Sequence, residues 1–231
     1  MDRLLQRAEK TYGRFERGQL PHPPEDLLQA VGRLLDLTTD EYTTMWVHAR
    51  GHRPVQPLAS EVGTTVPANW QDACDGQKHM MYVTDSAWRV LAYNSAFADM
   101  FAERRVPRNT ARWMLLTEEA RRTLLDWQTA WAPSVAAPVR TAFAENPDNE
   151  ALKELDNDLR QDPIVGPIYT QGQDASIAPD GVDRRLHHPL HGPGLAKMVA
   201  SAPFSAPGAR AVIVIFEPDS DGQRSDLPHP P

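Results

Sequence analysis

The sequence predicts an α+β protein, with an all-helical N-terminal part followed by a mixed α/β domain. Three observations predict this class. Apolar residues recur at helical spacing through residues 1–51. Two β-prone runs flank the turn-forming residues Thr84-Asp85-Ser86, and a helix N-cap follows them. Residues 211–217, AVIVIFE, form an apolar run that is typical of a buried strand.

The composition argues against several classes of protein. A chain of 231 residues is long enough for one or two domains with proper cores. Its net charge of −7 argues against a protein that coats nucleic acid with its whole surface, but leaves room for one local basic face. Cys74 is the only cysteine, which excludes a disulfide within the chain and a thiolate metal cluster. No run approaches the ~18 apolar residues of a membrane span, and the N-terminus has no apolar signal core, so we expect a cytoplasmic protein.

Two short helices are expected before Pro24. The first carries the apolar residues Leu4, Leu5 and Ala8. The second runs from Thr11 to Arg17, with Thr11 as its N-cap. Gly18 stands where a left-handed residue commonly ends a helix.

Two longer helices are expected after Pro24. The apolar face of the first consists of Leu27, Leu28, Val31, Leu34 and Leu35. Thr38 and Glu41 form the capping-box pattern that begins the second. Its inner face consists of Tyr42, Met45, Trp46 and Ala49.

Residues 52–76 are expected to form a linker. Pro54, Pro57 and Gly63 interrupt any hydrophobic period in this segment. A brief helix over residues 67–74, with Trp70 on one side, fits the last stretch of it.

A strand, a tight turn, a second strand and a capped helix are expected in residues 80–101. The strand-forming residues are Met81, Tyr82 and Val83, and then Trp88, Val90, Leu91 and Tyr93. Asn94 and Ser95 are good N-caps for a helix that carries Phe97, Met100 and Phe101. This order is typical of the start of a PAS-type sensor of small molecules, although any α+β hairpin followed by a helix has the same pattern.

A helical block is expected between the two β regions. Thr117 begins one helix, whose first turn is acidic. The apolar positions of this block are Leu124, Trp127, Ala130, Trp131, Val135, Val139, Ala142, Phe143, Leu152, Leu155 and Leu159. Residues 163–167, PIVGP, are expected to end it, and residues 187–189 to begin the last β region. The polar, proline-rich tail 219–231 is expected to be disordered.

The sequence contains no pattern that indicates an enzyme. His187, His188 and His191 are three candidate zinc ligands, but they surround a proline in a loop without a convergent carboxylate. Cys74 has no histidine signature nearby, and no GxSxG elbow, GxGxxG or phosphate loop occurs. We therefore expect no metal, no cofactor and no catalytic residues. A small enzyme acting on an apolar substrate is the weakest alternative.

Aromatic and methionine side chains are concentrated in the central domain, where most of them are expected to form core. A cavity with apolar walls between sheet and helices would favour a largely apolar ligand. The expected apolar contributors are Trp88, Tyr93, Trp113, Met114 and Trp127. The candidates for polar anchoring are Arg112, Arg140 and His188.

The short helix KTYGRFER carries the basic residues Lys10, Arg14 and Arg17. Lysine and arginine suit phosphates and guanine, while Thr11 and Tyr12 suit phosphate or thymine-methyl contacts at the start of a recognition helix. An ordinary solvated helix with i,i+4 charges is the other interpretation, and the spacing alone favours it.

The N-terminal region resembles the later section of an XRE-type helix-turn-helix domain, over the run KTYGRFERGQLPHPPEDLLQAVGRLLDLTTDEYTTMWVHARG. The run has the ERG turn that closes the recognition helix, a proline-containing loop and two further helices. Such domains have a further complete helix at their start, whereas this chain begins at Met1 within what corresponds to their second helix. We therefore expect either a longer natural chain or a truncated DNA-binding unit that lacks its first helix.

The second half is similar in order and spacing to the ligand-binding domain of MmyB-like regulators. The similarity rests on YVTDSAWRVLAYN, RWMLLTEEARRTLLDW, PVRTAFAENPDNEALKELDNDL and LHHPLHG. That family joins an XRE helix-turn-helix to a PAS-like sensor, so both halves indicate one family. Tyr169 stands where the family often has tryptophan, and the usual His-Pro-acid-x-Gly segment reads HPLHG at residues 188–192.

The resemblance implies a bacterial transcription regulator that responds to a ligand and binds double-stranded DNA as a homodimer. Its segments would be a helix-turn-helix over residues 1–51, the linker 52–76, the PAS-like ligand-binding domain 77–218 and the tail. The residues expected to contact DNA are Lys10, Thr11, Tyr12, Arg14 and Arg17. The ligand would be small and largely apolar, with a fatty-acid-like compound as one candidate. The alternative is a DNA-binding-deficient sensor of small molecules or a protein-interaction module.

Overall fold

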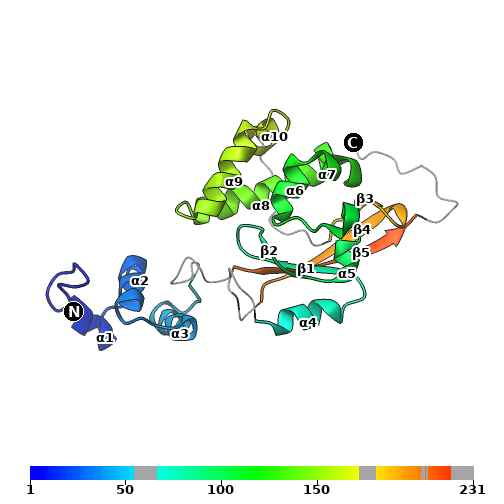
Figure 1. The fold of residues 1–231 in the computed structure, drawn as a ribbon. Helices are drawn as coiled ribbons and strands as arrows, with labels where there is room; N and C mark the ends of the chain where they lie inside the picture. Colours follow the sequence, from blue (N-terminus) through cyan, green and yellow to red (C-terminus); the bar gives the residue numbers. More distant parts are fainter. Residues whose placement is uncertain (55–66, 172–180, 204–205, 207, 220–231) are drawn as a thin grey trace. The chain divides into compact units, whose positions relative to one another are not determined.

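The computed structural model describes residues 1–54, 67–171, 181–203, 206 and 208–219, and the chain divides into two compact units, Met1–Val62 and Gly63–Pro231 (Figure 1). The first unit is helical and the second combines helices with a sheet, so the predicted α+β class is confirmed. The middle of the expected linker and the expected disordered tail from residue 220 lie outside the described residues.

The described region of the first unit contains three helices, α1 (Thr11–Glu16), α2 (Glu25–Leu34) and α3 (Thr39–Arg50). One cluster of its core is formed by Leu5, Leu27 and Val31, and a second by Leu28, Tyr42 and Trp46. Phe15 and Met45 contact both clusters. The helices therefore share one small core, with the predicted inner face of α3 turned into it.

The start of this unit differs from the prediction in two ways. The expected helix around Leu4 is wrong, because the chain forms turns there that bury Leu5 and leave Leu4 70% exposed. Thr11 is also not an N-cap, since α1 is preceded by Lys10 in a left-handed conformation with φ 69°. The Asp2 carboxylate takes over the capping role, accepting hydrogen bonds from the backbone N–H groups of Lys10 (2.8 Å) and Tyr12 (2.7 Å).

The predicted caps of this unit are otherwise confirmed. Gly18 has φ 66° after the end of α1. Thr38 and Glu41 form a reciprocal capping box, in which each side chain accepts a hydrogen bond from the backbone N–H of the other. Leu34 and Leu35 are an error in the predicted apolar face, because both leucines are exposed at the end of α2.

The second unit contains a five-stranded antiparallel sheet with the order β2-β1-β5-β4-β3 (Figure 1). Its strands are β1 (Met80–Thr84), β2 (Val90–Tyr93), β3 (Arg184–His188), β4 (Gly192–Ser201) and β5 (Arg210–Pro218). The predicted strand at 211–217 is confirmed as β5, which lies at the centre of the sheet between β1 and β4.

The two faces of the sheet are covered differently. On one face lies α4 (Asn69–Asp75), which packs Cys74 against Met81 and Val83 of β1. The main core lies on the other face, beneath the remaining helices of the unit (Figure 1). These helices are α5 (Ser95–Ala98), the 3₁₀ turn η1 (Ala102–Arg104), α6 (Thr110–Leu116), α7 (Glu118–Thr123), the π-helical turn η2 (Trp127–Trp131), α8 (Ala132–Glu145), α9 (Glu150–Gln161) and α10 (Val165–Gln171).

The predicted strand–turn–strand–helix is confirmed, except that Trp88 belongs to the turn. Its backbone has φ 62°, a left-handed conformation that is uncommon for a large side chain. The Asp85 carboxylate holds this turn by accepting hydrogen bonds from the N–H groups of Ala87 (2.9 Å) and Arg89 (2.8 Å). The guanidinium of Arg210 covers the Trp88 ring at 4.0 Å from its centroid. Several contacts therefore fix a conformation that the tryptophan alone would not favour.

The helical block is also confirmed in outline, with two differences. The helical face predicted through Leu124 to Trp131 is interrupted at Asp126, which has φ 56° and precedes the π-helical turn. The block does not end at residues 163–167 either, because α10 begins there. The Asp162 carboxylate caps α10 by accepting from the N–H of Val165 (2.8 Å), and Gly166 permits a close crossing, since a Cβ there would lie 2.8 Å from the carbonyl oxygen of Arg160.

Asn94 joins three elements through its buried side-chain amide. Its Oδ1 accepts hydrogen bonds from the backbone N–H of Met81 in β1 (3.0 Å) and of Phe97 in α5 (3.0 Å). Its Nδ2 donates to the carbonyl oxygens of Gln77 (2.9 Å) and His79 (2.7 Å), in the segment that leads into β1. One side chain therefore satisfies four backbone groups that no regular ladder serves.

Replacing Asn94 with alanine is expected to lower the free energy of unfolding by about 3 kcal/mol, because buried backbone groups lose their hydrogen bonds together. Chemical denaturation measures this loss. The matched control is Asn149→Ala, since Asn149 caps α9 through a single bond to the N–H of Leu152 and should cost about 1 kcal/mol. Equal losses in the two variants would contradict the joining role of Asn94.

Candidate functional site

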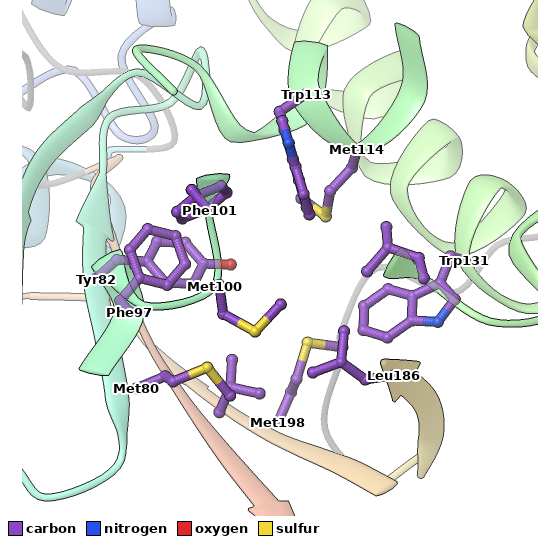
Figure 2. A pocket seen from close by; sticks show the side chains of 12 residues that line it. Met80, Tyr82, Phe97, Met100, Phe101, Trp113, Met114, Trp131, Leu186 and Met198 are labelled. Carbon is purple, nitrogen blue, oxygen red and sulfur yellow. The ribbon is translucent and has the colours of Figure 1, made fainter. Parts of the chain in front are cut away.

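A cavity of about 50 Å³ lies in the main core of the second unit, between the sheet and the helices above it (Figure 2). Its floor is a row of three residues that pair directly across neighbouring strands, Met80 in β1, Val214 in β5 and Met198 in β4. Leu186 extends this floor from β3. Alternate residues of a strand point to one face, so the pairing register of these strands determines which side chains meet the cavity.

One wall of the cavity is a chain of aromatic rings (Figure 2). Tyr82 and Phe97 are stacked with their ring centroids 4.3 Å apart. Phe97 meets Phe101 edge to face at 5.0 Å, and Phe101 meets Trp113 in the same way at 4.9 Å. Both arrangements are favoured geometries for aromatic pairs, so this wall is a rigid component of the site.

Met100, Met114, Leu124 and Trp131 complete the lining. The indole N–H of Trp131 donates to the carbonyl oxygen of Arg185 (2.9 Å), which connects the π-helical turn to β3. Trp127, in the same turn, donates to the carbonyl oxygen of Met114 (2.7 Å) in α6. A π-helical turn adds one residue to a helical register, and here both of its tryptophans are fixed by hydrogen bonds to other elements.

The cavity is apolar, since its lining contains no charged side chain among the residues that the structure describes. Burial raises the pKa of Tyr82 to about 12, because the charged phenolate would be poorly solvated there, while the nearby Arg210 acts in the opposite direction. The phenol therefore stays protonated at neutral pH and can donate a hydrogen bond. Such a site can bind a largely apolar molecule with few polar groups.

Two of the eight residues predicted to bind ligand, Trp113 and Met114, line this cavity. Trp88 lies in the β1–β2 turn under Arg210, and Tyr93 is 40% exposed at the end of β2. Trp127 is buried behind the lining, with its indole N–H bound to the backbone of Met114.

The polar candidates have structural partners instead. Arg140 donates from α8 to the carbonyl oxygen of Tyr169 (2.9 Å) and lies against its ring, so it connects α8 with α10. Arg112 forms an ion pair with Asp158, which connects α6 with α9. His188 ends β3, and its Nδ1 accepts from the backbone N–H of Leu190 (3.1 Å). None of the three lines the cavity.

Most of the lining was not predicted from the sequence. Met80, Tyr82, Phe97, Met100 and Phe101 belong to the stretch that predicted the fold, and the alternation of Met80 and Tyr82 along one strand was an available signal for a shared face. The lining residues from β3, β4 and β5 could not be found in this way, because their position depends on strand pairing between distant segments.

The predicted DNA-binding residues lie on or beside α1 in the first unit. Lys10, Arg14 and Arg17 are exposed. Thr11 and Tyr12 are half-buried, and the Tyr12 ring packs against the core of the unit. The basic side chains are therefore accessible, whereas Tyr12 has a packing role.

The histidines considered as metal ligands lie at the β3–β4 turn. The rings of His188 and His191 are 4.6 Å apart, and His188 also faces Phe216 at 5.3 Å. Among the residues that the structure describes, no three His, Cys, Asp or Glu side chains are grouped so as to hold a metal ion. Within the same residues, no helix has the length and apolar character needed to cross a membrane.

The stability of the protein is expected to depend on the protonation of His188. Burial lowers its pKa below the ordinary value of 6.5, with smaller effects from His191 and His187, while Asp99 acts in the opposite direction. The unfolded chain therefore takes up this proton first as the pH falls, and the free energy of unfolding decreases below about pH 6.5 until the folded-state pKa is passed.

His188→Asn keeps an acceptor for the N–H of Leu190 and removes the titration, so its denaturation midpoint should fall less between pH 7 and pH 5 than that of the wild type. The same substitution at the exposed neighbour His187 is the control. An identical pH dependence in wild type and His188→Asn would exclude His188 as the source.

The second unit is an α+β domain with an apolar cavity between its sheet and its helices. The particular kind follows from comparison with known families, since residues 71–227 match the MmyB-like transcription regulator ligand binding domain. The match covers more than half of the chain, and the protein therefore belongs to this family, as its sequence motifs predicted. Comparison with curated proteins gives no match.

Proposed function

We propose that this protein is a DNA-binding transcription regulator that acts in the cytoplasm as a homodimer and changes its operator affinity when a small, largely apolar molecule enters the cavity. The cavity is the observation that carries the proposal, because it lies within the segment that matches a regulator's ligand-binding domain. Membership of a regulator family indicates a role other than catalysis. A fatty-acid-like molecule is one candidate ligand.

The first unit supports the DNA-binding aspect of the proposal. Lys10, Arg14 and Arg17 are exposed on or beside one short helix, and their charges suit the phosphates of a duplex. The chain as a whole is acidic, with a net charge of −7, so unspecific attraction to DNA is weak and this face would have to provide the contacts. Two such units in a dimer would read two half-sites.

The proposed mechanism is a population shift. A ligand that binds one arrangement of the dimer better than another stabilises that arrangement, and the spacing of the two DNA-binding units changes with it. Coupling between two sites is commonly worth about 5- to 150-fold in affinity, and it is reciprocal. Operator DNA should therefore change the ligand affinity by the same factor as the ligand changes the DNA affinity.

The test is a titration of labelled promoter fragments with the full chain across a salt series, with and without a ligand that binds the cavity. Saturable, salt-sensitive binding and an equilibrium shift of about fivefold or more on adding ligand are expected. Ligand binding without DNA binding at any salt concentration would favour the alternative, a sensor or protein-interaction module that has no operator.

Arg14→Ala is expected to weaken DNA binding and to reduce the slope of log affinity against log salt by about one, because one phosphate contact is lost. Fluorescence anisotropy with a fixed promoter fragment measures both quantities. Arg33→Ala, which removes an exposed arginine of α2 outside the predicted DNA face, is the control for net charge. If both variants lose the same DNA affinity, the effect is one of net charge and a specific contact between Arg14 and a phosphate is excluded.

A further inference from the structure

The hydroxyl of Tyr82 is a polar group without a partner, among the described residues, inside an apolar cavity. Tyr82 is 8% exposed, and Figure 2 shows its oxygen directed toward the middle of the cavity, away from the Phe97 ring on which it stacks. The causes that shift the pKa of Tyr82 include no hydrogen bond, and its oxygen has no hydrogen-bond partner among the residues that the structure describes. A hydroxyl that faces an apolar cavity and forms no hydrogen bond to the protein is available to donate to a group that enters the cavity.

The other polar atoms of the lining are already engaged. Trp113 donates its indole N–H to the Glu119 carboxylate (2.8 Å), and Trp131 donates to the carbonyl oxygen of Arg185 (2.9 Å). A buried water usually makes about two to four hydrogen bonds. A water at this oxygen would meet the Tyr82 hydroxyl and otherwise thioether, aliphatic and aromatic groups, so the described lining offers it a single hydrogen bond.

We propose that the cavity binds a compact, uncharged molecule with an apolar body and one hydrogen-bond acceptor, and that Tyr82 donates its hydroxyl proton to that acceptor. This inference rests on the proposed function, since it concerns the same cavity, and it specifies the class of ligand. The described lining offers a carboxylate one neutral donor and no cation, so it favours an uncharged acceptor over the fatty-acid-like candidate named above.

The lining favours an aromatic ring over a long chain. Four of the lining residues are methionines, Met80, Met100, Met114 and Met198, whose flexible side chains can adapt to a bound molecule. The aromatic wall from Tyr82 to Trp113 is more rigid and offers ring faces and edges for stacking.

Three probes of similar shape test whether the cavity requires an uncharged hydrogen-bond acceptor, an apolar body alone or a negative charge. Acetophenone has an uncharged acceptor, ethylbenzene has none, and benzoate carries a negative charge; octanoate is added as a fatty-acid-like probe. Each is titrated into the full chain with ¹³C-labelled methionine methyl groups. Shifts of Met80 and Met198, assigned by Met→Leu substitution, report binding in this cavity. The variants are Tyr82→Phe and, as the matched control, Tyr93→Phe at a tyrosine that does not line the cavity.

Acetophenone should bind the wild type about two- to tenfold more tightly than ethylbenzene, which is the expected value of one hydrogen bond. Tyr82→Phe should remove this difference without changing the affinity for ethylbenzene, and Tyr93→Phe should preserve it. Tyr82→Phe should also be at least as stable as the wild type, because the hydroxyl forms no hydrogen bond within the described residues that the substitution would remove. A purely structural role for the hydroxyl predicts a loss of stability.

Other results overturn the inference and leave the proposed function standing. Preferred binding of benzoate or octanoate would show that the cavity accepts an anion. Equal affinity for acetophenone and ethylbenzene, or an unchanged difference in Tyr82→Phe, would remove Tyr82 as the donor. If no probe moves the methionine signals, this class of ligand is excluded, while the DNA titration still decides the proposed regulator function by itself.

Discussion

The ligand-binding domain depends on the way Asn94 connects β1 to α5. A helix has free backbone N–H groups only in its first turn, so α5 cannot be joined to β1 by a regular ladder. The Asn94 amide accepts from one N–H of each element, and it holds the approach to β1 with its other two bonds. The floor residue Met80 and the wall residue Phe97 consequently face the same space. The cavity thus depends on the hydrogen bonds by which Asn94 connects β1 to α5, as well as on the size of the side chains that line it.

Local patterns predicted most of the elements and only some of the site. Capping motifs such as Thr38 with Glu41, and alternation such as Met80 with Tyr82, are encoded within a few residues and could be read directly. The features that the sequence did not predict depend on contacts between residues that are distant in the chain. Asp2 caps α1 from several residues away along the chain. The prolines and the glycine at residues 163–167 suggested the end of a helix, but α10 begins there because Asp162 caps it. The cavity floor similarly requires the register of β1, β5 and β4.

The packing of arginines on aromatic rings explains why Arg140, one of the predicted polar anchors, is absent from the cavity. Several arginines of this domain place their guanidinium group over an aromatic ring, as Arg210 does on Trp88 and Arg121 on Trp127. Arg140 and Arg160 approach the ring of Tyr169, whose hydroxyl donates to the buried carboxylate of Asp156 (2.7 Å). A guanidinium can stack and form hydrogen bonds at the same time, so these residues join helices and strands to one another. These arginines therefore pack against aromatic residues of the domain and do not line the cavity.

The position of β5 has a consequence for how the protein is made. The central strand of the sheet follows every other strand in the chain, and it separates β1 from β4 in space. A ribosome that has released β1, the helices and the β3–β4 hairpin has therefore produced two pieces of sheet with exposed edges and no strand to join them. Pairings over such long sequence separations form slowly. The cavity, whose floor includes Val214 of β5, is completed only after nearly all of the described chain has emerged.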